Sequence, residues 1–453
     1  MTATTATEHD ARRRRTVVWV VSLATVGLIF DGYDLVVYGV VLPIFLDDPD
    51  QIGQVTPALG GTLGSYALLG MLVGALIAGA VGDIVGRRRV MLTAYAWFSI
   101  GMLVTALTSS TAMFGLWRFL TGLGIGALIA TTGALVAEFA PPGKKNLCNA
   151  ITYSGVPLGS LLGAFIAILL LDLIGWRGMF MIGALPILTL LPLAFLKMPE
   201  SVSWLVARGR VEEAREVSER TGMPMPVSVP AAASAERAGF AGLFSRTFWF
   251  ATVLTGILSA LAQFLNYYLN TWLPALMERS GFNAKGSLAF LLVLSGGAIV
   301  GALTGSRFAD RFGPKLVIAA SFLIGAVSIV LLTFDLPLAV RLAFVAVVGL
   351  GTTGTSIMIY GLVANHFPTK MRGASVAWAA GFGRLGGTSG PLLGGLLLAA
   401  GLSVNGSFYV LGGLALLGAV LTLMVPRAHR AADLHPVPVE PAVPVATGVS
   451  KAT

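Results

Sequence analysis

The sequence of 453 residues contains little charge, few histidines and a single cysteine. Charged residues make up 11% of the chain, whereas soluble globular proteins carry roughly 25%. Cys148 has no second cysteine to pair with, which excludes an internal disulfide. The four histidines show no metal-ligand spacing, and no phosphate-binding loop occurs. We therefore expect neither an enzyme nor a protein that depends on a metal, on ATP or on another cofactor.

Apolar sequence is abundant instead. Hydrophobic residues make up 56% of the chain and gather in repeated long runs. A helix needs about 20 predominantly apolar residues to cross a bilayer. The sequence therefore predicts an all-α polytopic membrane protein with twelve transmembrane helices. The predicted spans are residues 16–46, 56–81, 90–108, 112–139, 149–172, 177–197, 247–277, 286–308, 315–334, 338–365, 372–400 and 404–426.

Basic residues lie mostly on one side of these predicted spans. Arg12–Arg15, Arg87–Arg89 and the hydrophilic segment 198–246 share that side, whereas the loop 47–54 contains three aspartates and no base. Because cytoplasmic loops are enriched in Lys and Arg, the basic side is predicted to be cytoplasmic, together with both termini. These loops account for the formal net charge of +9, so no nucleic-acid partner is expected.

The two halves of the chain repeat each other at an offset of 227 residues. Asp83 then falls on Asp310, and Pro141 falls on Pro368. Parallel repeats of this kind indicate two pseudo-symmetric six-helix bundles with a binding site between them near the midplane. The predicted organisation is a cytoplasmic tail (1–15), an N-terminal bundle (16–197), a cytoplasmic linker with an amphipathic helix (198–246), a C-terminal bundle (247–426) and a disordered cytoplasmic tail (427–453).

Two acids, Asp31 and Asp34, interrupt the first apolar run. A charged carboxylate near the bilayer centre costs about 2.5–3.5 kcal/mol on insertion scales. Residues three apart share a helix face, and burial and mutual repulsion both favour the protonated form of a carboxylate. We predict that at least one of the two acids carries a coupled proton. The alternative for one of them is a structural ion pair with an arginine on another helix.

Two arginines lie well inside predicted spans rather than near their ends. Arg118 of the fourth span is predicted to pair with Asp34 or with the carboxylate of a substrate, and its alternative is to extend to the outer surface. Arg384 of the eleventh span is the other candidate for a substrate carboxylate, with a helix–helix hydrogen bond to a carbonyl or to Asn365 as its alternative.

Aromatic and amide side chains supply the remaining candidates for substrate contact. Tyr38 lies four residues after Asp34, on the same helix face. The seventh span is unusually rich in amides, which need partners in apolar surroundings. We select Tyr267 and Asn270 from that span and Tyr360 from the tenth.

Two short turns resemble a signature of the major facilitator superfamily. The first runs from Gly79 through Asp83, Gly86, Arg87 and Arg88, and has Ile84 where the family usually has Arg. The second contains Asp310, Arg311 and Gly313, with Ser306 in place of the leading glycine. The resemblance implies that both turns belong to a cytoplasmic gate. Glu138, at the cytoplasmic end of the fourth span, is predicted to form a salt bridge in this gate, the alternative being a proton carrier.

Other motifs resemble one branch of that superfamily, the aromatic acid:proton symporters. They are Asp31-Gly-Tyr-Asp34-Leu-Val-Val-Tyr38, Pro199-Glu200-Ser201 with Trp204-Leu205, Asn270-Thr-Trp272-Leu-Pro274, and Gly383-Arg384-Leu-Gly-Gly with Gly390-Pro391. The resemblance implies uptake of a benzoate-like aromatic carboxylate with a proton across the plasma (inner) membrane. The proton gradient replaces a cofactor, and the expected partners are the acid, H⁺ and membrane lipid, with a monomer as the default. The alternatives are a symporter for another organic acid or metabolite, such as nicotinate or a sugar, and a proton-coupled drug exporter.

Overall fold

The computed structural model describes residues 3–141, 144–225, 240–368 and 371–426, and these contain helices and no strand. The first half comprises α1 (Ala3–Asp47), α2 (Pro57–Val85), α3 (Arg87–Leu107), α4 (Thr111–Phe139), α5 (Lys145–Tyr153), α6 (Gly155–Gly183), the short helix η1 (Leu185–Ile187) and α7 (Leu190–Lys197). The second half comprises α11 (Trp249–Arg279), α12 (Ala284–Phe312), α13 (Pro314–Leu331), α14 (Leu338–Gly349), the π-helical turn η2 (Leu350–Gly354), α15 (Thr355–His366), α16 (Arg372–Ala399) and α17 (Val404–Met424).

Ten stretches of helix in the described part of the chain are long and apolar enough to cross a membrane. The eleventh predicted span is the 28-residue helix α16, which carries Arg384 near its middle. The sixth follows Gly175, whose positive φ of 65° breaks the helix between the predicted fifth and sixth spans. It consists of the end of α6, η1 and α7. The chain therefore has the predicted twelve-helix layout.

Two boundaries differ from the prediction. Helix α1 begins at Ala3 rather than at residue 16, because no Gly or Pro interrupts residues 3–15 and a formed helix extends at little cost through good helix formers such as Arg and Ala. In residues 198–225 the linker forms two short helices, α8 (Val202–Ala207) and α9 (Val211–Thr221). Gly209, with φ of 74°, separates them. The predicted tail 427–453 lies outside the described residues.

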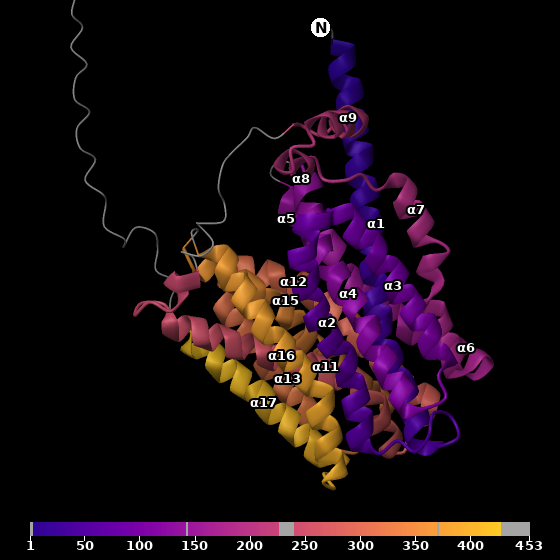
Figure 1. Ribbon diagram of the computed structural model, residues 1–453. Coiled ribbons are helices and arrows are strands. Elements are labelled where there is room, and N and C mark those ends of the chain that lie inside the picture. Colours follow the sequence, from indigo (N-terminus) through magenta and orange to yellow (C-terminus); the bar gives the residue numbers. More distant parts are fainter. Residues whose placement is uncertain (1–2, 142–143, 226–239, 369–370, 427–453) are drawn as a thin grey trace, which may run out of the picture.

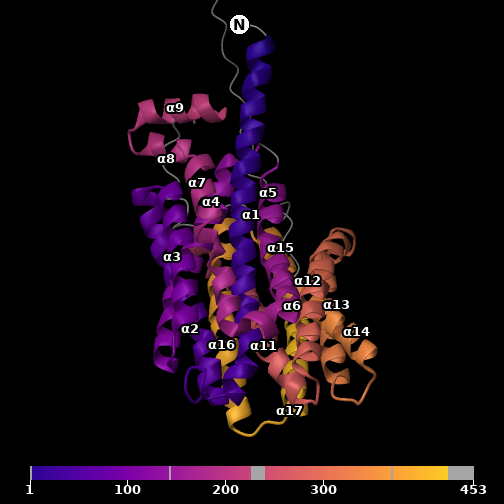
Figure 2. The ribbon, with the colours of Figure 1, turned by 90° about the vertical axis from the view of Figure 1, so that its right-hand side faces the viewer.

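The helices form two bundles that lie side by side (Figure 1). Helices α1–α7 form the N-terminal bundle and α11–α17 the C-terminal bundle, while α8 and α9 cover one end of the N-terminal bundle (Figures 1 and 2). The hydroxyl of Thr16 donates to the carbonyl of Thr221, which fixes α9 against α1. We call this end of the molecule the linker side.

The two bundles contact each other closely on the side away from the linker. The hydroxyl of Ser65 in α2 donates to the carbonyl of Thr388 in α16 at 2.8 Å. Lys285 of α12 forms an ion pair of 2.9 Å with Asp172 of α6. Toward the linker side, by contrast, a methyl group placed on Gly381 of α16 would meet no atom within 4 Å. The bundles therefore converge away from the linker and diverge toward it, as Figure 1 shows.

Candidate functional site

Asp34 and Arg118 form an ion pair inside the N-terminal bundle. Their whole-residue exposures are 1% and 2%, and the Arg118 guanidinium donates to Asp34 Oδ1. The guanidinium carbon also lies 5.4 Å from the centre of the Tyr38 ring and 5.8 Å from that of Phe180. Asp34 Oδ2 and Arg118 Nε have no hydrogen-bond partner. This pair is buried and its hydrogen bonds are only partly satisfied, so loss of either charge would leave the other one buried without a partner.

The second acid, Asp31, belongs to a different set of residues. It lies within electrostatic range of Arg384, which extends from α16 of the other bundle. Arg384 also interacts with Tyr267 of α11 and Tyr360 of α15. One guanidinium nitrogen of Arg384 lies 3.7 Å from the sulfur of Met71 in α2, so Arg384 faces the N-terminal bundle. The structure thus gathers an acid, a base and two aromatic rings from four helices between the bundles.

Tyr153 also interacts with Arg384, and sequence reasoning missed it. It is the last residue of α5, immediately before the helix is interrupted at Ser154. Its side chain is 40% exposed, and its hydroxyl donates to the carbonyl of Ile129 at 3.4 Å. The signal available in the sequence was weak: a tyrosine beside Ser-Gly inside a predicted span.

Two of the residues predicted to contact substrate form hydrogen bonds to other parts of the protein. The Tyr38 hydroxyl donates to the carbonyl of Gly60 in α2 rather than to Asp34, because its ring extends away from the acid toward α2. The Asn270 amide donates to the carbonyl and to the side-chain oxygen of Asn266, one turn earlier in α11. The carbonyl of Asn270 lies against Gly39 of α1, in the closed contact between the bundles.

A small cavity lies beside the buried ion pair. It lies between α1, α2 and α4 of one bundle and α11 of the other. Its lining includes both partners of the buried ion pair, and it extends to Tyr267 beside Arg384. The lining residues are Asp34, Leu35, Tyr38, Gly64, Ala67, Leu68, Met71, Arg118, Tyr267 and Thr271.

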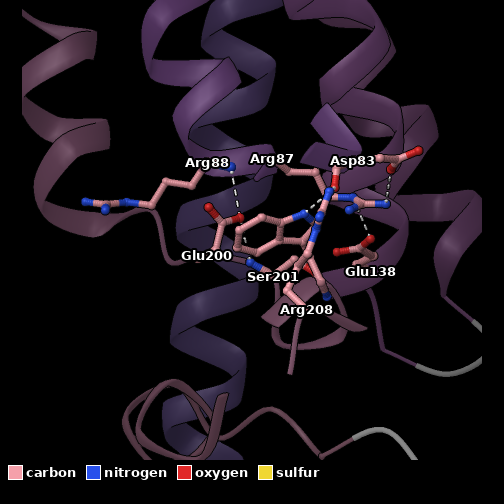
Figure 3. A network of polar contacts seen from close by, with 8 residues as sticks. Asp83, Arg87, Arg88, Glu138, Glu200, Ser201 and Arg208 are labelled. Carbon is pink, nitrogen blue, oxygen red and sulfur yellow. Dashed lines mark hydrogen bonds and ion pairs between the residues drawn. The ribbon is translucent and has the colours of Figure 1, made fainter. Parts of the chain in front are cut away.

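The first of the two repeated turns, residues 79–88, joins α2 to α3 on the linker side (Figure 3). Gly86 occupies this turn with φ of 105°, a conformation that other residues rarely adopt. Arg87 contacts Asp83 at 3.3 Å and Glu138 of α4 at 2.8 Å. Glu138 therefore forms a salt bridge within the N-terminal bundle. Gly79, one turn before Asp83, has open space beside it.

The linker binds the same turn from its other face (Figure 3). Glu200 accepts a hydrogen bond of 3.1 Å from the backbone N–H of Arg88. Arg208 and the indole of Trp204 donate to the carbonyl of Asp83 at 2.7 and 2.9 Å. Sequence reasoning noted the Pro-Glu-Ser motif but did not connect it with the turn, because these residues are more than a hundred positions apart.

The second turn joins α12 to α13, and within the described residues no hydrogen bond or ion pair connects it to the linker. Gly313 again has a positive φ, of 88°, and nothing lies within 4 Å of the place where its side chain would be. Arg311 lies 5.4 Å from the ring of Phe312. Within the described part of the chain, the exposed Asp310 forms no ion pair. Within the described residues, the first turn is thus held by the linker, whereas the second is held through Lys315, whose ammonium donates to the carbonyl of Val425.

Comparison with known proteins gives consistent results. The profile of the Major Facilitator Superfamily matches residues 24–306 and 287–449. A benzoate transport protein of Acinetobacter baylyi is 33% identical over 90% of this chain and 89% of its own length. A gentisate transporter of Corynebacterium glutamicum is 31% identical, over 89% of this chain and 86% of the relative. A 4-hydroxybenzoate transporter of Pseudomonas aeruginosa is 30% identical, over 84% and 87%.

Solved structures show the same fold. A D-xylose-proton symporter superposes with a TM-score of 0.70 at 19% identity, covering 91% of this chain and 99% of that one. The inward-open xylose transporter of Escherichia coli gives a TM-score of 0.72 at 20% identity, covering 90% of this chain and 96% of that one.

Proposed function

Because this chain belongs to the major facilitator superfamily, we propose that it is a secondary transporter that imports a benzoate-like aromatic carboxylate together with a proton. The named cargoes of the three sequence relatives support this proposal, since each is an aromatic ring that bears a carboxylate. The proposed location is the inner membrane, with the linker side and both termini in the cytoplasm.

The observation that carries the proposal is the cluster around Arg384. An arginine binds a carboxylate through two parallel hydrogen bonds, and tyrosine rings offer faces and edges on which an aromatic ring packs. Arg384 lies between the bundles with Tyr153, Tyr267 and Tyr360 around it. This combination fits one aromatic ring with one carboxylate, whereas a neutral sugar has no use for the arginine.

The proposed proton-binding group, Asp31, lies near the same arginine. In our proposal Asp31, in electrostatic range of Arg384, takes up a proton from the outer side. Arg384 then loses its internal counter-charge and binds the substrate carboxylate. The buried pair of Asp34 and Arg118 is the second proposed proton site. The cavity lined by this pair extends to Tyr267, which also interacts with Arg384, so a change of charge at one proton site can affect the other.

The arrangement of the bundles corresponds to one step of alternating access. The contacts between Ser65 and Thr388 and between Asp172 and Lys285 close the side away from the linker. With the linker side in the cytoplasm, this is the inward-facing step. In the opposite step, we propose that the turns at Asp83 and Asp310 approach each other and close the cytoplasmic side.

The test is uptake of labelled benzoate into proteoliposomes that contain the purified full-length protein. We expect uptake that rises with an imposed inward proton gradient and that collapses when the gradient is dissipated. Asp31→Asn is expected to abolish gradient-driven uptake. Arg220→Gln, at an exposed position of α9, is the control and is expected to transport normally. No uptake of benzoate, hydroxybenzoates or nicotinate by the wild-type protein would reject the proposed function.

A further inference from the structure

An apolar groove runs along the outside of the N-terminal bundle, away from the cluster around Arg384. Helices α2 and α3 form its walls and α4 forms its floor. Ile77 and Val85 line one wall, Trp97 lines the other, and Leu123 lies on the floor. Ile77 and Trp97 are 52% and 45% exposed, so the groove is open to the surroundings of the bundle.

Small residues on the floor and walls give the groove its depth. Gly124 of α4 packs so closely on α3 that an added Cβ would lie 2.9 Å from the Trp97 ring. Gly74 of α2 lies in the same way against the backbone of Leu123. Helix α4 therefore approaches both neighbours, while α2 and α3 diverge from their shared turn at Gly86 and leave the space between them unfilled.

The length and position of the groove match one leaflet of a bilayer. Along α3 it extends from Arg89 to Trp97. Eight residues of helix span about 12 Å at 1.5 Å per residue. Half of the hydrocarbon core is about 15 Å. A groove of this length that begins beside Arg89 at the membrane surface would reach nearly to the midplane, which is the length available to an acyl chain.

Arg89 gives the groove a charge at its surface end. It is exposed and lines the groove. The neighbouring arginines are occupied, Arg87 by Asp83 and Glu138, and Arg88 by the carbonyl of Phe195 at 2.6 Å. Within the described residues, the Arg89 guanidinium has no ion-pair or hydrogen-bond partner.

We propose that this groove is a binding site for one anionic phospholipid of the linker-side leaflet. An acyl chain lies against Ile77, Trp97 and Leu123, and the phosphate group contacts Arg89. Both walls and the floor belong to one bundle, so the site persists while the bundles move against each other. The proposal does not depend on which substrate the protein carries.

Native mass spectrometry of the purified full-length protein tests the proposal. The probes are phosphatidylglycerol and phosphatidylcholine with the same palmitoyl and oleoyl chains. One basic residue near the surface favours an anionic lipid by about fivefold. We expect that preference in the wild-type protein and its loss in Arg89→Gln. Thr93→Trp, which fills the groove from its exposed wall, is expected to reduce binding of both lipids.

Two variants serve as matched controls. Ala320→Trp adds the same indole at the repeat-equivalent exposed position of α13, and Arg307→Gln removes one charge elsewhere on the linker side. Both are expected to bind lipid like the wild-type protein. Unchanged lipid binding in Thr93→Trp, or an unchanged preference in Arg89→Gln, would overturn the proposal. A lipid-free protein dimer that dissociates in Thr93→Trp would also overturn the proposal, because the groove would then bind a second copy of the chain.

Discussion

Gly61 of α2 and Gly395 of α16 lie backbone to backbone across the contact between the two bundles. A Cβ placed on Gly395 would lie 2.9 Å from the Cα of Gly61, and one on Gly61 would lie 3.0 Å from the Cα of Gly395. Only the absence of side chains allows the helices to approach this closely. Closure of the side away from the linker therefore depends on having glycine, with no side chain, at both positions.

A side chain at this contact is expected to prevent the side away from the linker from closing. Gly395→Val should shift the protein toward the state that is open away from the linker, since rigid helices cannot close over the added methyl groups. Accessibility of a single cysteine at position 65, in a Cys148→Ser background, measures the shift. Gly413→Val, on α17 where nothing lies within 4 Å, is the control. Equal labelling of both variants would contradict the prediction.

The buried pair of Asp34 and Arg118 predicts a non-additive effect on stability. Removing one partner of a buried ion pair costs about 3–5 kcal/mol, because the other charge stays buried and unpaired. Arg118→Gln should therefore lower the melting temperature strongly, and Asp34→Asn combined with Arg118→Gln should restore much of it. Thermal unfolding of the three purified proteins tests this double-mutant cycle. Additive losses in the double variant would show that the two side chains are independent.

Arg384 is expected to determine the affinity for the carboxylate. A hydrogen bond to a charged group contributes about 1.5–3 kcal/mol, and each 1.4 kcal/mol is about a factor of ten in affinity. Arg384→Gln should raise KM for benzoate by about tenfold to hundredfold and should leave the protein folded. Arg384→Lys, which keeps the charge but not the paired donors, should lie in between. A KM unchanged in Arg384→Gln would exclude this residue from the substrate site.

The ion pair between Asp172 and Lys285 is expected to matter little for stability and to report on conformation. Both side chains are more than half exposed, at 69% and 62%. Exposed pairs contribute at most about 1 kcal/mol. Asp172→Asn should therefore transport almost normally. In a Cys148→Ser background, a short bismaleimide joining Asp172→Cys to Lys285→Cys should stop uptake by holding the side away from the linker closed. Full uptake after complete cross-linking would show that this side does not open.

Much of the fold follows from the sequence, because crossing a bilayer requires about 20 apolar residues and basic loops mark one side. The break at Gly175 and the span that carries Arg384 were both predictable on this basis. The limits of α1 were not, since Arg12–Arg15 are compatible both with a tail and with a continued helix.

That Asp31 and Asp34 lie on one face of an apolar helix follows from their spacing alone, because helical geometry fixes which residues share a face. Their partners follow from how the helices pack: Asp34 pairs with Arg118 of its own bundle, and Asp31 interacts with Arg384 of the other. Spacing along one helix carries no information about which other helix packs against it. That choice is made by packing between helices, where glycines such as Gly61 permit contacts that no local pattern reveals.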